Sequence, residues 1–391
     1  MSLPVILSAC RTPIGKFQGA LSGVAATELG AKAIRAALDK SGVGPELVEE
    51  AIMGMVLPAG VGQAPARQAA LRAGIPNRVA ALTVNMVCGS GLKAVMLASR
   101  AIRCGDASVI VAGGMESMSQ APWLIERQLR GLGDHSLVDS MMHDGLSCSI
   151  SHLSMGDIAE RLARQRNITR ADQDAYSCES HRRAVAAQRE NRFQNEIVSL
   201  PASTKPSAAL VTSDEGPRAE CSLDQLAKLR PAFVADGTVT AGNSAMISDG
   251  AGAVVVASAE FAKSHRVAPL AEIVAATTAG LNPEDLFVAP VAAIQILLAK
   301  TGYRIEDIDL WEINEAFAVQ MLACQRSLGI ASEKLNTLGG AIALGHPIGA
   351  SGARVLTTLV HSLRHSNREL GVAALCLGGG NAVAMLVRRL S

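Results

Sequence analysis

The sequence predicts an α/β protein with more than one domain, on three observations. Strand-like and helix-like segments alternate over residues 4–117 and again from about 266 to 391, a pattern typical of sheets covered by helices. Apolar residues make up 49% of the chain and aromatic residues only 3%, with 36 glycines, so we expect a core of Ala, Val, Ile and Leu. The 391 residues also exceed the roughly 250–300 at which a single core stops growing.

The first region, residues 1–118, supplies the first run of alternating elements. Strands are expected at residues 5–9, 49–57 and 109–114, and helices at residues 27–38, at 66–74 and from Gly89 onward. Alternation of this kind predicts a mostly parallel sheet. We assign residues 1–118 to a first half of the protein, which continues at 247–265.

Residues 119–246 differ in composition from the regions on either side, because they are polar, charged and rich in helix formers. Thr169 is a candidate N-cap, and Asp172 three residues later is typical of the first turn of a helix. We therefore expect an inserted domain over 119–246.

The last region, residues 266–391, returns to the alternating pattern. A strand is expected at 271–280, a helix at 291–302, a strand leading into residues 314–317, and, after a glycine-rich stretch and a helix, a final strand around 372–377. Segments 109–118 and 373–385 resemble each other, because each follows a long helix and ends in a glycine turn. This similarity indicates a duplicated fold, with a chance likeness of two glycine-rich strand ends as the alternative.

Charge and cysteine usage narrow the classes of partner. The formal net charge is +1, too small to attract nucleic acid or an anionic membrane, so a small-molecule partner is expected. No run of about 18 apolar residues predicts a spanning helix, and a strand beginning at Pro4 leaves no room for a signal peptide; we expect a cytoplasmic protein. The eight cysteines lack the short paired spacing of a zinc site, so no metal is expected.

Cys88 is the first candidate for chemistry. It follows a strand-like run and precedes Gly89, Ser90 and an apolar helix. A thiol at this place faces the N–H groups of a helix N-terminus, which favour the nucleophilic thiolate. The small residues after it allow a sharp strand-to-helix turn, as in other nucleophile elbows. A buried structural cysteine is the alternative.

His346 is the second candidate, within GGAIALGHPIGASGAR at residues 339–354, where five glycines surround one imidazole. The glycine spacing fits neither the dinucleotide fingerprint nor the phosphate-binding loop that ends in GK[ST]. The segment therefore indicates a catalytic loop, in which His346 acts as a base toward Cys88 or as a donor to a carbonyl oxygen.

Cys376 and Asn314 each stand where a strand ends. Cys376 closes the strand VAALC, and open α/β sheets place their sites at such ends. A disulfide between Cys376 and Cys88 is a rival interpretation. Asn314 leaves its strand in WEINEAFA and could orient a water or a carbonyl, whereas a helix cap is its ordinary role.

Taken together, four segments in this order resemble the thiolase family: TVNMVCGSGLKA, NEAFA, GGAIALGHPIGASGAR and CLGGG. ACRTPIGKF near the start and GTVTAGN at 237–243 fit as well, so the resemblance covers essentially the whole chain. Within the family the acetoacetyl-CoA thiolases, or acetyl-CoA C-acetyltransferases, are the most similar. The resemblance implies a duplicated thiolase fold of five layers, α-β-α-β-α, in which the inserted loop domain binds coenzyme A, and it implies a homotetramer.

The resemblance also implies an activity and roles for five residues. The activity is the reversible Claisen condensation of two acetyl-CoA to acetoacetyl-CoA and CoA, by a ping-pong mechanism through an acyl-Cys88 thioester. Cys88 loses its proton to His346, and Cys376 later removes an α-proton. His346 and a water fixed by Asn314 hold the enolate oxygen, and the N–H groups of Cys88 and Gly378 hold the acyl-enzyme oxyanion. Coenzyme A thioesters are substrates, so no cofactor and no metal is expected.

Coenzyme A contacts are implied at positions that match the family pattern less closely. They are Met155, Arg218, Leu229, Phe233, Ala241, Ser244, Ala245, Ala316 and Phe317. The chain departs from the family at Ala245, where a serine is frequent, and at Ser154–Met155, where a His–Met pair is common. LFVAP at 286–290 replaces the MGxGP of many members. These departures bear on pantetheine hydrogen bonds and on acyl chain length.

Four other functions are alternatives to the condensation of acetyl-CoA. A 3-ketoacyl-CoA thiolase of β-oxidation would use the same groups with a roomier acyl pocket. A non-catalytic acyl-CoA-binding protein is expected to have lost Cys88, His346 or Cys376, all of which are present. A cysteine hydrolase built on Cys88, His346 and Asn314 would leave Cys376 without a role. Condensing enzymes that use acyl carrier protein or make polyketides typically lack a second catalytic thiol, so Cys376 discriminates against them.

Overall fold

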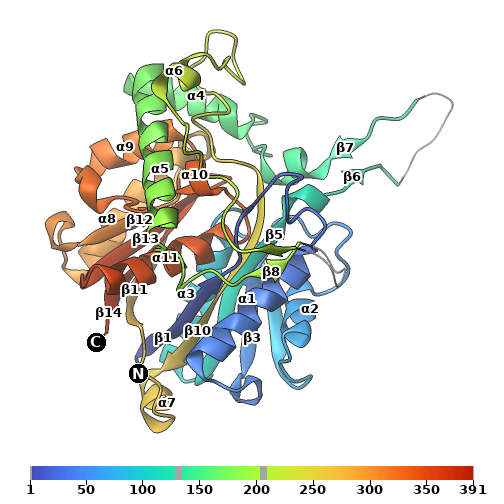
Figure 1. Ribbon diagram of the computed structural model, residues 1–391, viewed down its shortest axis with the longest axis vertical. Coiled ribbons are helices and arrows are strands. Elements are labelled where there is room, and N and C mark those ends of the chain that lie inside the picture. The colour runs from blue at the N-terminus through green and yellow to red at the C-terminus, as the bar shows by residue number, and fades with distance from the viewer. Residues whose placement is uncertain (1, 128–133, 203–208, 391) are drawn as a thin grey trace.

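The protein is described by a computed structural model that covers residues 2–127, 134–202 and 209–390. Within these residues the main feature is a sheet of ten strands (Figure 1), in the order β12-β13-β14-β11-β1-β10-β5-β3-β4, with β2 beside β10. Its strands are β1 (Pro4–Arg11), β2 (Gly15–Lys16), β3 (Glu50–Gly54), β4 (Ala80–Val84), β5 (Val109–Ser117), β10 (Ser248–Ser258), β11 (Ala271–Gly280), β12 (Leu310–Ile313), β13 (Leu370–Leu377) and β14 (Asn381–Arg389).

The expectation of a mostly parallel sheet is wrong. Only β3 with β4, β3 with β5, and β12 with β13 run parallel in the described part of the sheet, and the other neighbours are antiparallel. One reason is that β13 and β14 form a hairpin over Gly378–Gly380. Another is that β10 returns from the long segment after β5, whereas parallel neighbours follow a crossover connection such as a helix.

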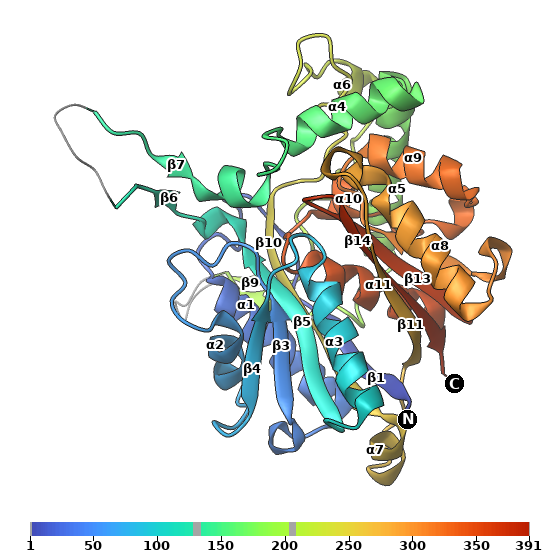
Figure 2. The same cartoon turned by 180° about the vertical axis from the view of Figure 1, so that it is seen from behind.

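Helices divide the sheet into two halves and give the molecule five layers. In the described part of the sheet, strands of the two halves pair with each other only at β1 and β11, where Val5 lies opposite Glu272 and Ile6 opposite Ala271. Helices α3 (Ser90–Cys104) and α11 (Ser351–His365) pack between the halves, while α1 (Ala26–Ser41) and α2 (Pro65–Arg72) cover one outer face and α8 (Ala289–Thr301) the other. Figures 1 and 2 show this arrangement from opposite sides. The predicted α/β fold with α-β-α-β-α layers is thereby confirmed.

The core between the halves joins side chains from both. One buried cluster contains Val95 and Leu356 from the two middle helices, and Ile110 and Leu375 from the two half-sheets. Each half also carries its own outer core, under α1 and α2 or under α8. The two middle helices therefore fix the relative position of the strands that lead to the site.

The segment between β5 and β10 leaves the sheet. It contains the hairpins β6 (Trp123–Leu124) with β7 (Val138–Asp139) and β8 (Leu200–Pro201) with β9 (Leu210–Val211), and helices α4 (Met155–Arg166), α5 (Arg170–Arg189) and α6 (Leu223–Ala227). Thr169 caps α5 and Asp172 completes a capping box, so that prediction is confirmed. The limits 119–246 of an inserted domain stay a prediction.

The other helices are short or surround the C-terminal half. They are α7 (Ala259–Ser264), α9 (Ala318–Leu328) and α10 (Ala341–Leu344), with helical turns at 45–47, 118–120, 141–145, 283–288, 305–307 and 332–334. None of the helices in the described ranges is both long and apolar enough to cross a membrane.

Candidate active site

The segments that follow β4, β12 and β13, and the loop between α10 and α11, meet around one small cavity of about 70 Å³. Cys88, His346, Cys376 and Gly378 all line it. Four predicted residues from three distant segments of the sequence are thus brought together. The rest of the wall is mostly apolar and includes Leu146, Leu286, Phe287, Phe317 and Ile348.

Cys88 follows a strained turn. β4 ends at Val84 and α3 begins at Ser90, and between them Val87 has a φ of 47°, which is a rare value for a β-branched residue. The Ser90 hydroxyl holds this turn, because it donates to the Val87 carbonyl (2.6 Å) and accepts from the Met86 N–H (2.8 Å). Such strain concentrates at functional sites.

The resting thiol of Cys88 keeps its proton. Burial raises the pKa of Cys88 to about 12, although the backbone N–H groups of Cys88 and Gly378 lie against the thiol and lower it. The N–H groups favour the thiolate, but lost hydration outweighs them in the resting protein. Cys88 needs a base when it reacts.

His346 is held in one orientation and one tautomer. The Ser351 hydroxyl lies 2.6 Å from Nδ1 of His346 and 2.9 Å from the Pro347 carbonyl oxygen. We assign the hydroxyl proton to this carbonyl, so that Nδ1–H of His346 donates to the Ser351 oxygen. The lone pair of Nε2 is left free to take a proton.

The His346 imidazole is also kept neutral. Burial lowers its pKa to about 3, and the positive charge of Arg354 adds to the effect. Gly345, directly before His346, has a φ of 113°, and a Cβ there would lie 2.3 Å from the Ser248 hydroxyl. Only glycine therefore fits the turn that presents the imidazole.

Cys376 is the second thiol of the cavity. It lies near the end of β13 and is 2% exposed. Burial raises its pKa well above the ordinary value, and the nearby thiols of Cys88 and Cys324 act in the same direction. Both thiols of the site therefore start protonated.

Asn314 lies behind the cavity and is not part of its wall. It is fully buried, and its Nδ2 is 3.4 Å from Nδ1 and 3.5 Å from Nε2 of His346. Its Oδ1 has no hydrogen-bond partner in the described part of the protein. Asn314 is thus a neighbour of the imidazole with one free acceptor.

A larger cavity of about 450 Å³ adjoins the small one, and both share Leu146, Met155, Ala245 and Phe317 in their walls. Four more of the predicted contacts line the larger cavity: Arg218, Phe233, Ala241 and Ser244. Ala316 lines only the small one. Leu229 lines neither cavity, and packs instead beside Gly242, where a Cβ would lie 2.6 Å from its methyl group.

Sequence reasoning did not single out several residues at these cavities. Leu286 and Phe287 close the small cavity. The only indication of them in the sequence is that LFVAP at 286–290 departs from the family pattern. Ser351 stands in the same glycine-rich segment as His346, but its bond to the imidazole depends on the fold. Phe17 and His181 reach the larger cavity from distant segments and carry no sequence signal. In the described ranges, no group of three His, Cys, Asp or Glu side chains is placed to hold a metal ion.

Comparison with known proteins agrees with this geometry. Residues 4–260 match the thiolase N-terminal domain and residues 267–389 the thiolase C-terminal domain. An acetyl-CoA acetyltransferase of Pseudomonas aeruginosa is 48% identical over 388 residues, which cover 98% of this chain and 99% of that protein.

Two solved structures are also similar. The crystal structure of the Bacillus anthracis acetyl-CoA acetyltransferase has a TM-score of 0.98 at 39% identity and covers 100% of this chain and 99% of that one. A thiolase from Ascaris suum in complex with coenzyme A has a TM-score of 0.94 at 41% identity, covering 99% of this chain and 100% of that one. With two domain matches and relatives over nearly its whole length, the chain belongs to the thiolase family of acyltransferases.

Proposed function

We propose that this protein is an acetyl-CoA C-acetyltransferase, which condenses two acetyl-CoA to acetoacetyl-CoA and CoA and also catalyses the reverse thiolysis. The observation that carries the proposal is the meeting of two thiols and a neutral imidazole at one small cavity. The names of the P. aeruginosa and B. anthracis relatives support it.

The first half-reaction transfers an acetyl group to Cys88. The Cys88 sulfur attacks the thioester carbonyl of acetyl-CoA while its proton passes to Nε2 of His346. The backbone N–H groups of Cys88 and Gly378, which lie against the thiol, hold the oxygen that becomes negative. The carbon–sulfur bond to CoA then breaks, and the CoA thiolate takes the proton of Cys376. This leaves acetyl-Cys88, a protonated His346 and a Cys376 thiolate.

The second half-reaction makes the carbon–carbon bond. The Cys376 thiolate removes a proton from the methyl group of a second acetyl-CoA, and its raised pKa makes it a strong base. The enolate oxygen is held by the Nε2–H of His346 and by a water bound to Asn314, whose free Oδ1 supports this role. The enolate carbon attacks acetyl-Cys88, acetoacetyl-CoA leaves, and the Cys88 thiolate recovers its proton from His346.

A short acyl group fits the small cavity best. Its volume of about 70 Å³ is small beside the 450 Å³ of the neighbouring cavity, which supports a small acyl group there. Phe287 and Phe317 meet edge to face there with ring centroids 5.2 Å apart, and Leu286 completes this wall. The larger cavity, with Phe233, Ser244 and Arg218, receives the pantetheine and nucleotide of coenzyme A, a role supported by the coenzyme A complex of the Ascaris suum thiolase.

Thiolysis rates at equal concentration of acetoacetyl-CoA and of longer 3-ketoacyl-CoA substrates test this function. A steep fall beyond acetoacetyl-CoA and its nearest homologues is expected. A flat profile would instead indicate the 3-ketoacyl-CoA thiolase of β-oxidation.

We also infer a homotetramer that works in the cytoplasm. Apolar side chains are exposed along the β6–β7 arm, which projects from the body of the molecule (Figure 2), and at Leu82 on the edge strand β4. Such groups indicate surfaces covered by other subunits. Eight cysteines are free in the structure, and a mechanism based on two thiols requires reducing surroundings.

A further inference from the structure

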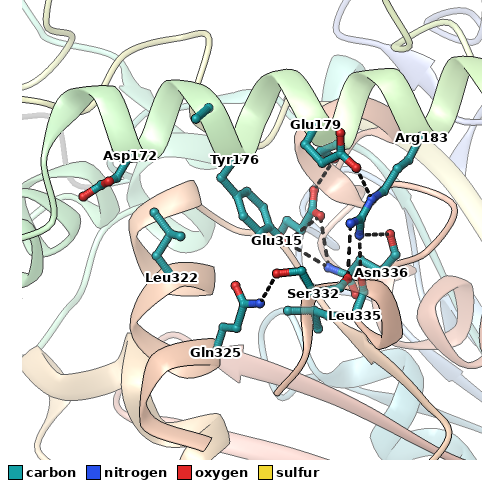
Figure 3. Close-up of a pocket in the computed structure, with 12 residues that line it drawn as sticks. Asp172, Tyr176, Glu179, Arg183, Glu315, Leu322, Gln325, Ser332, Leu335 and Asn336 are labelled. Atoms are coloured by element: carbon teal, nitrogen blue, oxygen red, sulfur yellow. Dashed lines mark hydrogen bonds and ion pairs between the residues drawn. The ribbon is translucent and has the colours of Figure 1, made fainter. Parts of the chain in front are cut away.

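Glu315 is a buried carboxylate directly after Asn314, and the mechanism above gives it no role. It is 1% exposed and accepts four hydrogen bonds. Oε1 accepts from the Tyr176 hydroxyl (3.0 Å) and from Nδ2 of Asn336 (3.0 Å), two residues that lie beside Glu315 in Figure 3. Oε2 accepts from the Ser180 hydroxyl (2.7 Å) and from the Ile342 N–H (3.1 Å). Within the described residues no Lys or Arg forms an ion pair with it.

Two of these bonds fix the end of β12, and so the position of Asn314. Nδ2 of Asn336 also donates to the Ile313 carbonyl (2.8 Å), and Oδ1 of Asn336 accepts from the Ile313 N–H (2.9 Å). The side chain of Asn336 therefore pairs with the edge of β12 as a strand would. Tyr176, from α5, reaches the same carboxylate oxygen.

The other two bonds fix the loop that carries His346. Ile342 belongs to α10, and the chain runs from there through Gly345 to His346. Ser180, which donates to Glu315, also accepts from the Gly340 N–H (3.1 Å) at the start of α10. Gly340 packs so closely that a Cβ there would lie 2.2 Å from the Glu315 carboxyl carbon. The Glu315 carboxylate thus connects two segments, the one that carries Asn314 and the one that carries His346.

We propose that Glu315 is a positioning residue, which sets the place of Asn314 relative to His346 and ties both to helix α5. This inference rests on the proposed function and adds a residue to it. The arrangement requires an acceptor at both carboxylate oxygens. A glutamine would turn its NH2 group toward either Asn336 Nδ2 or the Ile342 N–H, neither of which can accept in place. Either orientation displaces one of the two segments.

The test compares Glu315→Gln with Glu179→Gln. Glu179 lines the outer pocket of about 300 Å³ on which Glu315 also borders (Figure 3), but its partners are the exposed Arg182 and the half-buried Arg183. Arg183 keeps its own bonds to the carbonyl groups of Leu335 and Asn336 when Glu179 is replaced. For Glu315→Gln we expect kcat of condensation to fall about 10²-fold, as for a displacement near 1 Å. This kcat is calculated per active site, and active sites are counted as the Cys88 residues that iodoacetamide labels when its reaction runs to completion. KM for acetyl-CoA should change far less than kcat, because only Ile342 and Phe317 in the wall of the larger cavity belong to the displaced segments. Glu179→Gln should match the wild type in both.

A second readout does not depend on the acyl-transfer reaction. Cys88 needs the base His346 to react, so the initial rate of its alkylation by iodoacetamide near neutral pH should fall at least about tenfold in Glu315→Gln and stay unchanged in Glu179→Gln. Should the wild type fail to condense acetyl-CoA, the proposed function fails while this rate still decides the role of Glu315.

Two results would overturn the inference. One is a Glu315→Gln protein whose alkylation rate and kcat per labelled site equal those of the wild type. The other is an activity that falls only in step with the folded fraction, as seen by circular dichroism. If Glu315→Gln does not fold, Ser180→Ala takes its place, because it removes the links to Glu315 and Gly340 and keeps the carboxylate. There kcat should fall severalfold at constant KM, and an unchanged kcat would count against the proposal.

Discussion

Cys88 and Cys376 face one cavity but are assigned different steps. Two backbone N–H groups lie against the Cys88 thiol, its own and that of Gly378, whereas the Cys376 thiol has its own N–H and the two neighbouring thiols beside it. The first surroundings suit a nucleophile that leaves an oxyanion beside it, and the second suit a strong base.

Substitution of each thiol by serine separates these steps. In Cys376→Ser we expect condensation to slow by at least about 10²-fold, because a hydroxyl ionises far less readily than a thiol. Acetyl-Cys88 should still form from acetyl-CoA and accumulate. Cys88→Ser should lose both steps, since the nucleophile is weakened.

Peptide mass spectrometry of Cys88, with acetoacetyl-CoA formation followed in parallel, measures both steps. A label on another cysteine of active enzyme would contradict the assignment of Cys88. Condensation at the wild-type rate in Cys376→Ser, or an acetylation defect as complete as in Cys88→Ser, would contradict that of Cys376.

The lowered pKa of His346 predicts an unusual pH dependence. A histidine of pKa near 6.5 would be mostly protonated at pH 5, and a step that needs it as base would slow roughly thirtyfold from its neutral-pH rate. The pKa of His346 is about 3, so the imidazole stays neutral and competent down to pH 5. The rate of Cys88 acetylation should therefore be nearly level between pH 7.5 and 5, with circular dichroism to verify that the protein stays folded. A tenfold or larger fall in folded protein would show that His346 has an ordinary pKa.

At the level of helices and loops, glycines with positive φ decide where the catalytic groups can lie. Gly345→Ala would add a Cβ 2.3 Å from the Ser248 hydroxyl and 2.7 Å from Ile14, and the loop would have to move. Gly302 is a matched control, because it has a φ of 77° with nothing within 4 Å of the added atom. Gly302→Ala costs about 1–2 kcal/mol of left-handed backbone strain. Gly345 has a φ of 113° and a ψ of 163°, a region that essentially only glycine adopts, so Gly345→Ala is strained as well and also meets a clash.

We expect Gly345→Ala to lower kcat at least tenfold, by displacing His346, and Gly302→Ala to keep kcat while its thermal midpoint falls by a few degrees. Steady-state kinetics and calorimetry of the two variants give both quantities. Equal kcat in the two proteins would mean that the His346 loop tolerates a side chain at Gly345.

Local signals were enough to predict most of the elements and the chemistry-bearing residues. The periodic segments became β1, α1, β3, α2, α3 and β5, and the cap at Thr169 starts α5. Strand direction could not be predicted, because β10 pairs with β1 and β5 from the far side of a long insertion. Cys88, His346 and Cys376 stand in motifs, whereas Ser351 and Glu315 act through bonds to residues that only the fold brings near.

The chain as a whole presents an apolar arm and a bare sheet edge. On the β6–β7 arm the exposed fractions are 64% for Trp123, 56% for Ile125, 56% for Leu137 and 41% for Val138. At the end of the sheet, β4 has a neighbour on one side only, and Leu82 on it is 46% exposed. Edge strands and apolar patches of this kind are normally covered. A body with two such surfaces can pair through each, which gives four subunits rather than two.

Light scattering should therefore report a mass near four times the 40.5 kDa of the chain at micromolar concentration. Trp123→Glu combined with Leu137→Glu places charges on the arm alone, so it should break one contact and leave dimers joined through β4. Ile296→Glu is the control, because Ile296 is 48% exposed on α8, away from both surfaces, and should stay a tetramer. A wild-type monomer would refute the assembly, and a tetramer that survives the arm substitutions would show that the arm is not one of its contacts.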